Sequence, residues 1–313
     1  MVTGYTDVPY NMGEIAQYVV TDEDRIVSEI IGAARCYFYD TCSLRRHACL
    51  DSSAEYILRY IKGQRAIVVI TRCILMELAS HSGVLNPEYI DYIRRISDYG
   101  ITVLVVYEES FFSVMEVCFG TNATINEYLC WAVRTTVGPV SSIKDMLKDN
   151  PCVNKEVVCG KGLDSSGVYS RFFQAARGVK ESGDNLGEDL LAICLQVLSH
   201  IPGEPDWKFC MITDDKGAAA KMDRIFKKVK HAHRGRRIGV FSTPRLAQTL
   251  YREGVLHDRE SLCAILGAGT NGNLSVLGVQ QYDIDSAEIT LTKDKLADLI
   301  MQPDGIAMIF CGE

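Results

Sequence analysis

Short apolar runs that alternate with helical patterns constrain the fold of this chain most strongly. Five runs are predicted as strands, at 36–40, 65–71, 101–107, 208–213 and 237–242. Runs of this length and composition are typical of strands buried on both faces, and strand-helix alternation is typical of a parallel sheet. We therefore predict an α/β fold with a doubly wound parallel sheet flanked by helices.

The alternation predicts how the chain is divided. It is interrupted between the third and fourth strands, where helical patterns predict an insertion over about 108–185. We expect an N-terminal helical extension over 1–34 and the α/β core over 35–257. Residues 258–313 are expected to form a small C-terminal extension with a charged helix near 292–301.

Acidic residues follow the predicted strands at one edge of the sheet. Asp40 ends the first strand, and Glu77 lies just past the second. Asp189 opens the helix before the fourth strand, and Asp215 follows that strand. Carboxylates gathered at the C-terminal ends of parallel strands repel one another, and a divalent cation is the usual reason to keep them together. The pattern predicts metal-dependent phosphodiester chemistry.

Two neighbouring acids leave the ligand set open. Glu188 precedes Asp189 and Asp214 precedes Asp215, so either neighbour could be the true ligand. A single acid of this kind is otherwise a helix N-cap or a surface charge, and Asp189 at a helix start fits that description by itself.

Composition excludes several classes of protein. The twelve cysteines include no Cys-x-x-Cys pair, which argues against a zinc site or a disulfide scaffold and favours reduced thiols. No apolar stretch reaches the roughly 18 residues of a membrane span, and the N-terminal residues do not resemble a secretory signal. We expect a cytoplasmic protein that does not enter a membrane.

Basic residues concentrate after the fourth predicted strand, although the net charge of the chain is -7. Residues 221–237 contain eight Lys or Arg against one Asp. Such a strip is a candidate phosphate-binding surface, and the alternative is a solvated helix face. The candidate nucleic-acid contacts, with two arginines that follow Asp40, are Arg45, Arg46, Lys216, Lys221, Lys227, Lys228 and Lys230.

The order of these motifs resembles that of the PIN-domain nucleases. The matching segments are 40–44 (Asp-Thr-Cys-Ser-Leu), 71–78 (Thr to Glu-Leu), 189–192 (Asp-Leu-Leu-Ala) and 213–215 (Thr-Asp-Asp). The resemblance covers roughly residues 35–257 without the insertion. One departure is Cys42, which replaces a residue that is often polar in the family, so we expect hydrogen bonding near Asp40 to shift to Thr41 or Ser43.

The resemblance implies a three-layer PIN-like core and an Mg²⁺- or Mn²⁺-dependent endoribonuclease. Its metal ligands would be Asp40, Glu77, Asp189 and Asp215, or the neighbours Glu188 and Asp214, supported by Thr41, Ser43 and Thr213. Single-stranded or looped RNA is the expected substrate. The alternative is a catalytically inactive PIN-like scaffold that binds RNA or assembles with other proteins. The sequence leaves open a homo-oligomer or a regulatory protein partner.

Overall fold

The structure, a computed structural model, describes residues 4–138, 141–159, 162–268, 272–280 and 287–308. Its central sheet contains five parallel strands in the order β3-β2-β1-β4-β5. These strands are β1 (Arg35–Tyr39), β2 (Ala66–Thr71), β3 (Val103–Val106), β4 (Phe209–Ile212) and β5 (Gly239–Phe241). The predicted α/β class, the parallel sheet and all five strands are confirmed.

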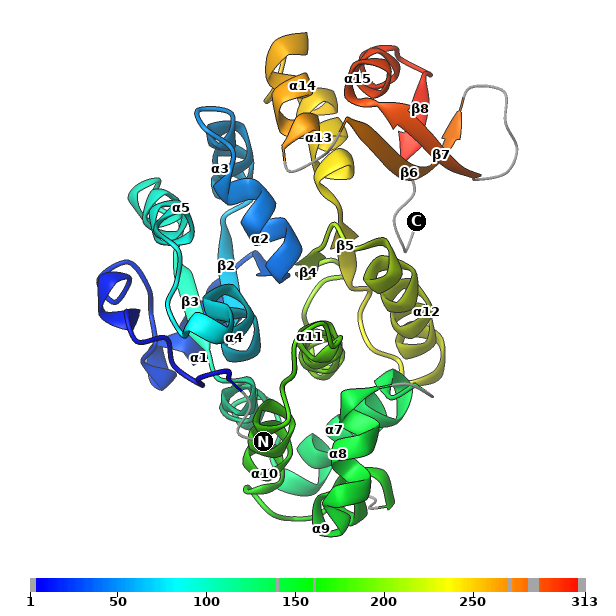
Figure 1. The fold of residues 1–313 in the computed structure, drawn as a ribbon. Coiled ribbons are helices and arrows are strands. Elements are labelled where there is room, and N and C mark those ends of the chain that lie inside the picture. The colour runs from blue at the N-terminus through cyan, green and yellow to red at the C-terminus, as the bar shows by residue number, and fades with distance from the viewer. Residues whose placement is uncertain (1–3, 139–140, 160–161, 269–271, 281–286, 309–313) are drawn as a thin grey trace.

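Helices cover both faces of this sheet (Figure 1). On one side lie α3 (Ala54–Gly63) and α5 (Pro87–Asp98), and on the other lie α11 (Leu186–Leu198) and α12 (Lys216–Ala232). All six residues of β2 are buried, as an apolar strand without polar alternation requires.

The strand order reverses at the centre of the sheet. From β1 the chain moves outward through β2 to β3, and from β4 it moves outward in the opposite direction to β5. Helices therefore leave the C-terminal ends of β1 and β4, which are neighbouring strands, toward opposite faces of the sheet. This position is where open α/β sheets bind their ligands.

Two helices begin directly where a strand ends. Helix α2 (Thr41–Ala48) follows β1, and α4 (Arg72–Ala79) follows β2. Helix α2 was not predicted from the sequence, and its first turn is capped by the Asp40 side chain. A carboxylate at this position satisfies a backbone N–H that has no partner within the helix, and it favours helix initiation.

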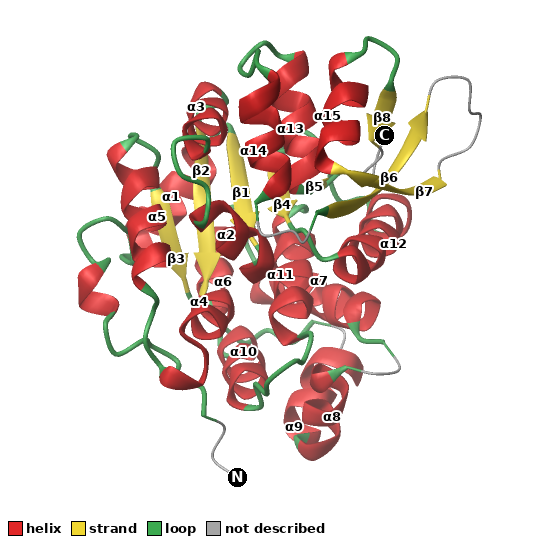
Figure 2. Cartoon of the chain, turned by 45° about the horizontal axis from the view of Figure 1, so that its top comes forward, coloured by secondary structure: helices red, strands yellow, loops and turns green. Residues whose placement is uncertain are grey.

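The stretch between β3 and β4 is helical, as predicted. After α6 (Phe111–Glu116) and α7 (Asn122–Thr136) the chain continues through α8, α9 and α10 to α11. Figure 2 shows these three helices at the end of the molecule opposite the C-terminal strands. Their bounds are α8 (Ser142–Asp149), α9 (Pro151–Asn154) and α10 (Val168–Gly178).

The N-terminal stretch contains helix α1 (Glu23–Gly32). After β5 the chain forms α13 (Thr243–Arg252) and α14 (Arg259–Gly267). A three-stranded antiparallel sheet in the order β7-β6-β8 follows, with β6 (Asn273–Gln280), β7 (Ala287–Thr292) and β8 (Ile306–Met308). Helix α15 (Lys293–Met301) confirms the helix predicted near 292–301, whereas this sheet was not predicted.

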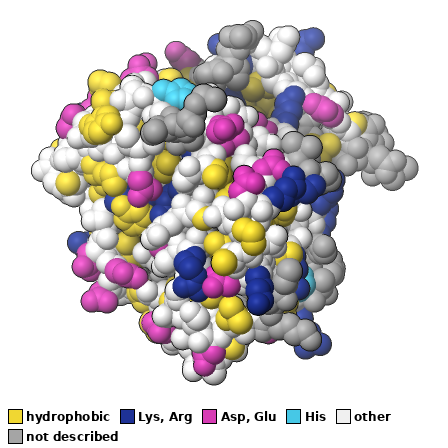
Figure 3. Space-filling view, turned by 60° about the horizontal axis from the view of Figure 1, so that its bottom comes forward, with side chains coloured by type: hydrophobic (Ala, Val, Ile, Leu, Met, Phe, Trp, Pro, Cys, Tyr) yellow, Lys and Arg dark blue, Asp and Glu magenta, His cyan; other side chains and the backbone are white. Residues whose placement is uncertain are grey.

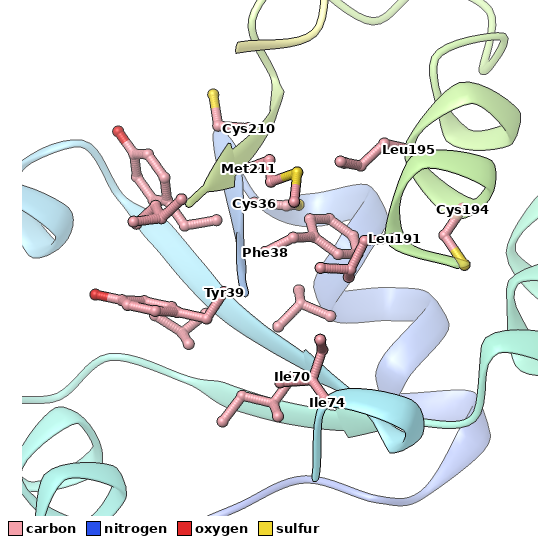
Figure 4. Packing of buried hydrophobic residues seen from close by; sticks show 14 of the residues in the cluster. Cys36, Phe38, Tyr39, Ile70, Ile74, Leu191, Cys194, Leu195, Cys210 and Met211 are labelled. Atoms are coloured by element: carbon pink, nitrogen blue, oxygen red, sulfur yellow. The ribbon is translucent and has the colours of Figure 1, made fainter. Parts of the chain in front are cut away.

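The hydrophobic core lies between the parallel sheet and the helices on both of its faces. Figure 4 shows Leu191 and Leu195 of α11 pointing toward Phe38 of β1 and Met211 of β4. All four side chains are fully buried. Their packing fixes α11 against the sheet, and it therefore fixes the acidic first turn of α11 at the sheet edge.

In the described residues, no helix is both long enough and apolar enough to span a bilayer.

Candidate active site

Asp40 lies at the end of β1, beside the reversal of strand order. One carboxylate oxygen accepts a hydrogen bond from the Thr41 backbone N–H at 2.7 Å. The other accepts from the Thr213 hydroxyl at 2.8 Å and lies 2.9 Å from the Cys42 thiol. Burial raises the pKa of Asp40, the hydrogen bonds lower it, and the nearby Asp215 charge raises it further. Of the hydrogen bonding that we expected to shift to Thr41 or Ser43, Thr41 donates to Asp40 through its backbone N–H, whereas Ser43 donates to Asp214 and the Cys42 thiol itself reaches Asp40.

Glu77 enters the same region from α4. Its Oε2 accepts a hydrogen bond from the Thr41 hydroxyl, and its Oε1 lies 3.1 Å from the ammonium of Lys180. The backbone of α11 passes close to this carboxylate, since a Cβ built on Gly187 would lie only 2.5 Å from Oε1. Burial raises the pKa of Glu77, and the charge of Lys180 opposes that shift. Glu77 is thus held on both oxygens.

The first turn of α11 presents two acids with different surroundings. Asp189 is 1% exposed, and its carboxylate binds the ammonium of Lys221 and the hydroxyl of Ser141, the latter at 2.9 Å. Glu188 is half-buried and has no described ion pair. Burial raises the pKa of Glu188 to about 8, with further contributions from the charges of Asp40, Asp215, Glu77 and Asp189. Glu188 therefore faces the other acids, whereas Asp189 is neutralised within the protein.

The two acids after β4 also differ. Asp214 accepts hydrogen bonds from Ser43 at 2.8 Å and from the Thr243 backbone N–H at 2.7 Å, and it lies 3.3 Å from the Arg46 guanidinium. Asp215 is exposed, and its Oδ1 accepts from the Ala218 backbone N–H at 2.8 Å, which caps α12. Asp214 ties α2 and α13 to β4, and Asp215 remains available to a ligand.

The acids therefore fall into two groups within the described residues. Glu77, Asp189 and Asp214 each lie beside a basic side chain of the protein, namely Lys180, Lys221 and Arg46. Asp40, Glu188 and Asp215 have no such partner among the described ion pairs. These three carboxylates, which we call the unpaired acids, come from the end of β1, the first turn of α11 and the end of β4.

The donor chemistry of the unpaired acids fits a hard divalent cation, because all their donor atoms are carboxylate oxygens. The side chains are not gathered around one point, however. In the part of the chain that the structure describes, no three His, Cys, Asp or Glu side chains lie close enough to hold a metal ion as they stand. A cation would have to draw the unpaired acids inward. Glu188 has the longest side chain of the three, so its carboxylate can move furthest toward a cation.

Several of the candidate nucleic-acid contacts are engaged within the protein. Arg46 is mostly buried and donates to the Leu266 carbonyl at 2.7 Å in addition to its contact with Asp214. Lys221 binds Asp189, and Arg45 donates to the Glu77 carbonyl at 2.7 Å. None of these three side chains is a freely solvated charge.

The other basic candidates lie along α12. Lys216 is exposed and lies 3.1 Å from Glu288 of β7, and Lys227 is exposed and lies 2.9 Å from Asp223. The side chains of Lys228 and Lys230 lie outside those described. Figure 3 shows basic side chains beside acidic ones on the face it views, not one continuous basic surface.

A surface hollow of about 560 Å³ lies at the opposite edge of the sheet. It is lined by Arg65, Ala66 and Thr102, which are at the starts of β2 and β3, and by Lys62. The unpaired acids lie at the C-terminal strand ends, so this hollow is separate from them.

Searches of the chain against protein-family models, curated proteins and solved structures find no match.

Proposed function

We propose that this chain is an Mg²⁺- or Mn²⁺-dependent endoribonuclease with a PIN-like three-layer core. The observation that carries the proposal is the set of unpaired acids Asp40, Glu188 and Asp215. They lie around the reversal of strand order and have no basic partner among the described ion pairs. Burial raises the pKa of Glu188 to about 8, with further contributions from the charges of Asp40, Asp215, Glu77 and Asp189. Keeping three such carboxylates together costs stability, which a bound cation would restore.

The unpaired acids would hold the metal ion. Glu77 would support them indirectly, through its hydrogen bond with Thr41 beside Asp40. A divalent cation bound there would lower the pKa of a coordinated water and neutralise charge on the scissile phosphate. We assign the position on α11 to Glu188 instead of Asp189, because Lys221 already neutralises Asp189. By the same reasoning Asp215 is favoured over Asp214 as the ligand after β4.

The surrounding residues orient these acids and the substrate. Thr213 and Cys42 fix one oxygen of Asp40, which leaves that carboxylate in a single orientation. Helices α11 and α12 both begin beside the unpaired acids, so their dipoles favour a phosphate there, although the Ala218 N–H of α12 already donates to Asp215. The site can thus attract an anionic backbone even though its side chains are acidic.

Cleavage of a labelled, unstructured single-stranded RNA tests the proposal. We expect cleavage with Mg²⁺ or Mn²⁺, none in excess chelator, and a loss of roughly 10²-fold or more in Asp40→Asn and in Glu188→Gln. The matched control is Asp98→Asn, an exposed acid at the end of α5, near the opposite edge of the sheet. Cleavage in chelator, or full activity in Asp40→Asn, would refute the assignment.

One observation favours the alternative of a non-catalytic RNA-binding or assembly scaffold, namely that the donors are not gathered around a metal position. Binding of Mn²⁺, followed by electron paramagnetic resonance without substrate, separates the two functions. A nuclease should bind Mn²⁺ and lose that binding in Glu188→Gln. A scaffold should bind RNA in chelator and show no specific Mn²⁺ signal.

A further inference from the structure

A cluster of aromatic and histidine rings lies apart from the acids. It contains Tyr128 and Trp131 of α7, His200 just after α11, and His233 just after α12. Tyr128 stacks on His200 with ring centroids 4.2 Å apart, and Trp131 stacks on His233 at 4.9 Å. Tyr128 and Trp131 also meet edge to face at 5.4 Å. We call these four rings the ring cluster.

The ring cluster is not part of the closed core. All four residues are partly exposed, whereas the aromatic residues of the sheet, such as Tyr37 and Phe38, are fully buried. The rings come from three separate segments and form a shared aromatic surface. The His200 ring is held by the Gln196 carbonyl at 2.8 Å and the His233 carbonyl at 3.2 Å. The cluster is therefore a preformed surface with fixed rings.

Three exposed arginines lie next to the rings. Arg134 is one turn beyond Trp131 on α7, and Arg234 directly follows His233. Arg236 donates its backbone N–H to the Ser199 carbonyl at 2.8 Å, which places it beside His200. One acid, Glu127, is the neighbour of Tyr128 and is half-buried. Rings with three arginines close by along the chain or through a backbone contact match nucleobases attached to a phosphate backbone.

The ring cluster and the unpaired acids lie at opposite ends of the same two helices. Helix α11 begins beside Glu188 and ends before His200, and α12 begins after Asp215 and ends before His233. Glu188 and His200 are 12 positions apart along the chain, which corresponds to about 18 Å at the helical rise. A strand of roughly four or more nucleotides is needed to reach from one end to the other, which is within the size of known single-strand sites.

We propose that the ring cluster is a base-stacking site for single-stranded RNA, which holds unpaired nucleotides several nucleotides away from the cleavage position. This inference rests on the proposed function for the identity of the nucleic acid. Stacking on Tyr128 and Trp131 accepts any base, and the arginines contact the phosphates. The site requires unpaired nucleotides, since bases within a duplex do not expose their faces.

Binding of fluorescein-labelled, unstructured RNA in excess chelator tests the site without cleavage. We expect Trp131→Leu and Tyr128→Leu each to weaken binding by roughly 5- to 100-fold, and Trp131→Phe to retain most of the affinity. Tyr10→Leu is the matched control, because Tyr10 is a 76% exposed aromatic residue outside the cluster. Arg234→Gln, an exposed change that leaves the fold intact, should flatten the salt dependence of binding.

A second measurement is independent of whether the leucine variants fold. The chain has two tryptophans, so Trp207→Phe leaves Trp131 as the sole tryptophan, whose fluorescence can be excited selectively. Single-stranded RNA should quench that fluorescence, whereas duplex RNA and heparin should not. Equal affinity of parent and Trp131→Leu, or no quenching, would overturn the ring-cluster site. Stacking on the cluster without metal-dependent cleavage would instead refute the nuclease and leave the binding site standing.

Discussion

The ammonium nitrogen of Lys180 lies 3.1 Å from Oε1 of Glu77, so the loop after α10 supplies a cation to an acid on α4. Lys180 is 2% exposed, and it also donates to the Glu181 carbonyl at 2.9 Å and binds Asp184. Burial lowers the pKa of Lys180, but the adjacent carboxylates outweigh burial and the pKa lies above its ordinary value. The helical insertion is thereby tied electrostatically to the site.

Lys180→Met should destabilise the protein by about 3 kcal/mol, because it leaves Glu77 buried without its cation. Adding Glu77→Gln to this variant should recover part of the loss, since the buried charge is then absent. Urea unfolding of the parent, both single variants and the double variant measures the coupling. Strict additivity of the two single changes would show that the contact contributes no stability.

Gly187→Ala should also disturb Glu77. The added methyl group would lie 2.5 Å from Glu77 Oε1, so the carboxylate must move away from Thr41 and Lys180. Alanine favours a helix over glycine by about 1 kcal/mol, and we expect the clash to reverse that gain. The matched control is Gly178→Ala in α10, where nothing lies within 4 Å of the added atom. Thermal unfolding should show a lower midpoint for Gly187→Ala and an equal or higher one for Gly178→Ala.

The sheet and its acidic edge could be predicted because each follows from local pattern. The run 66–71 is apolar throughout, and such a run forms a strand that must be covered on both faces. Asp40 and Asp215 directly follow strands, so the sheet determines their position. The position of these two acids at the sheet edge can be predicted without knowing how any side chain is oriented.

The choice between neighbouring acids could not be predicted from the sequence. Glu188 and Asp189 are adjacent on one helix turn, and their roles differ because Lys221, far along the chain, binds Asp189. Lys180 was missed for the same reason, since its contact with Glu77 depends on how the insertion folds back. Helix α2 was missed because its signal is a side-chain cap on a short polar stretch, without an apolar pattern.

Glu188→Gln should stabilise the metal-free protein, and more so as the pH rises. The pKa of Glu188 is about 8 in the folded chain, against an ordinary value of 4.5. The folded state therefore keeps a proton that the unfolded state releases between these values, so this group lowers the free energy of unfolding as pH increases through that range. Solvent screening of a half-buried group limits the effect to roughly 1–3 kcal/mol.

The measurement is urea unfolding of parent and Glu188→Gln in chelator at about pH 5 and about pH 8. The free energy of unfolding of Glu188→Gln should exceed that of the parent, and by more at the higher pH. Adding Mn²⁺ at the higher pH should stabilise the parent and leave the variant nearly unchanged. A difference in the free energy of unfolding that is independent of pH would mean that the pKa of Glu188 is not raised in the folded protein.

His47 should make the folded state sensitive to acid. Its ring is fully buried, with Nδ1 3.0 Å from the Tyr39 hydroxyl and Nε2 2.9 Å from the Thr243 hydroxyl. Burial lowers the pKa of His47 from 6.5 to about 4, although the charge of Asp214 opposes this shift. Between these values the unfolded chain binds a proton that the folded chain excludes, so stability falls as the pH drops from about 6.5 toward 4.

The contribution of His47 to this loss should reach about 3 kcal/mol, and it should disappear in His47→Gln, whose side chain does not titrate. Other carboxylates titrate over the same range, so the informative quantity is the difference between parent and variant in urea unfolding. Near neutral pH, where both ring hydrogen bonds form, the free energy of unfolding should be larger for the parent than for His47→Gln. In acid this difference should become smaller or change sign. A constant difference across the range would show that His47 accepts a proton within the folded state.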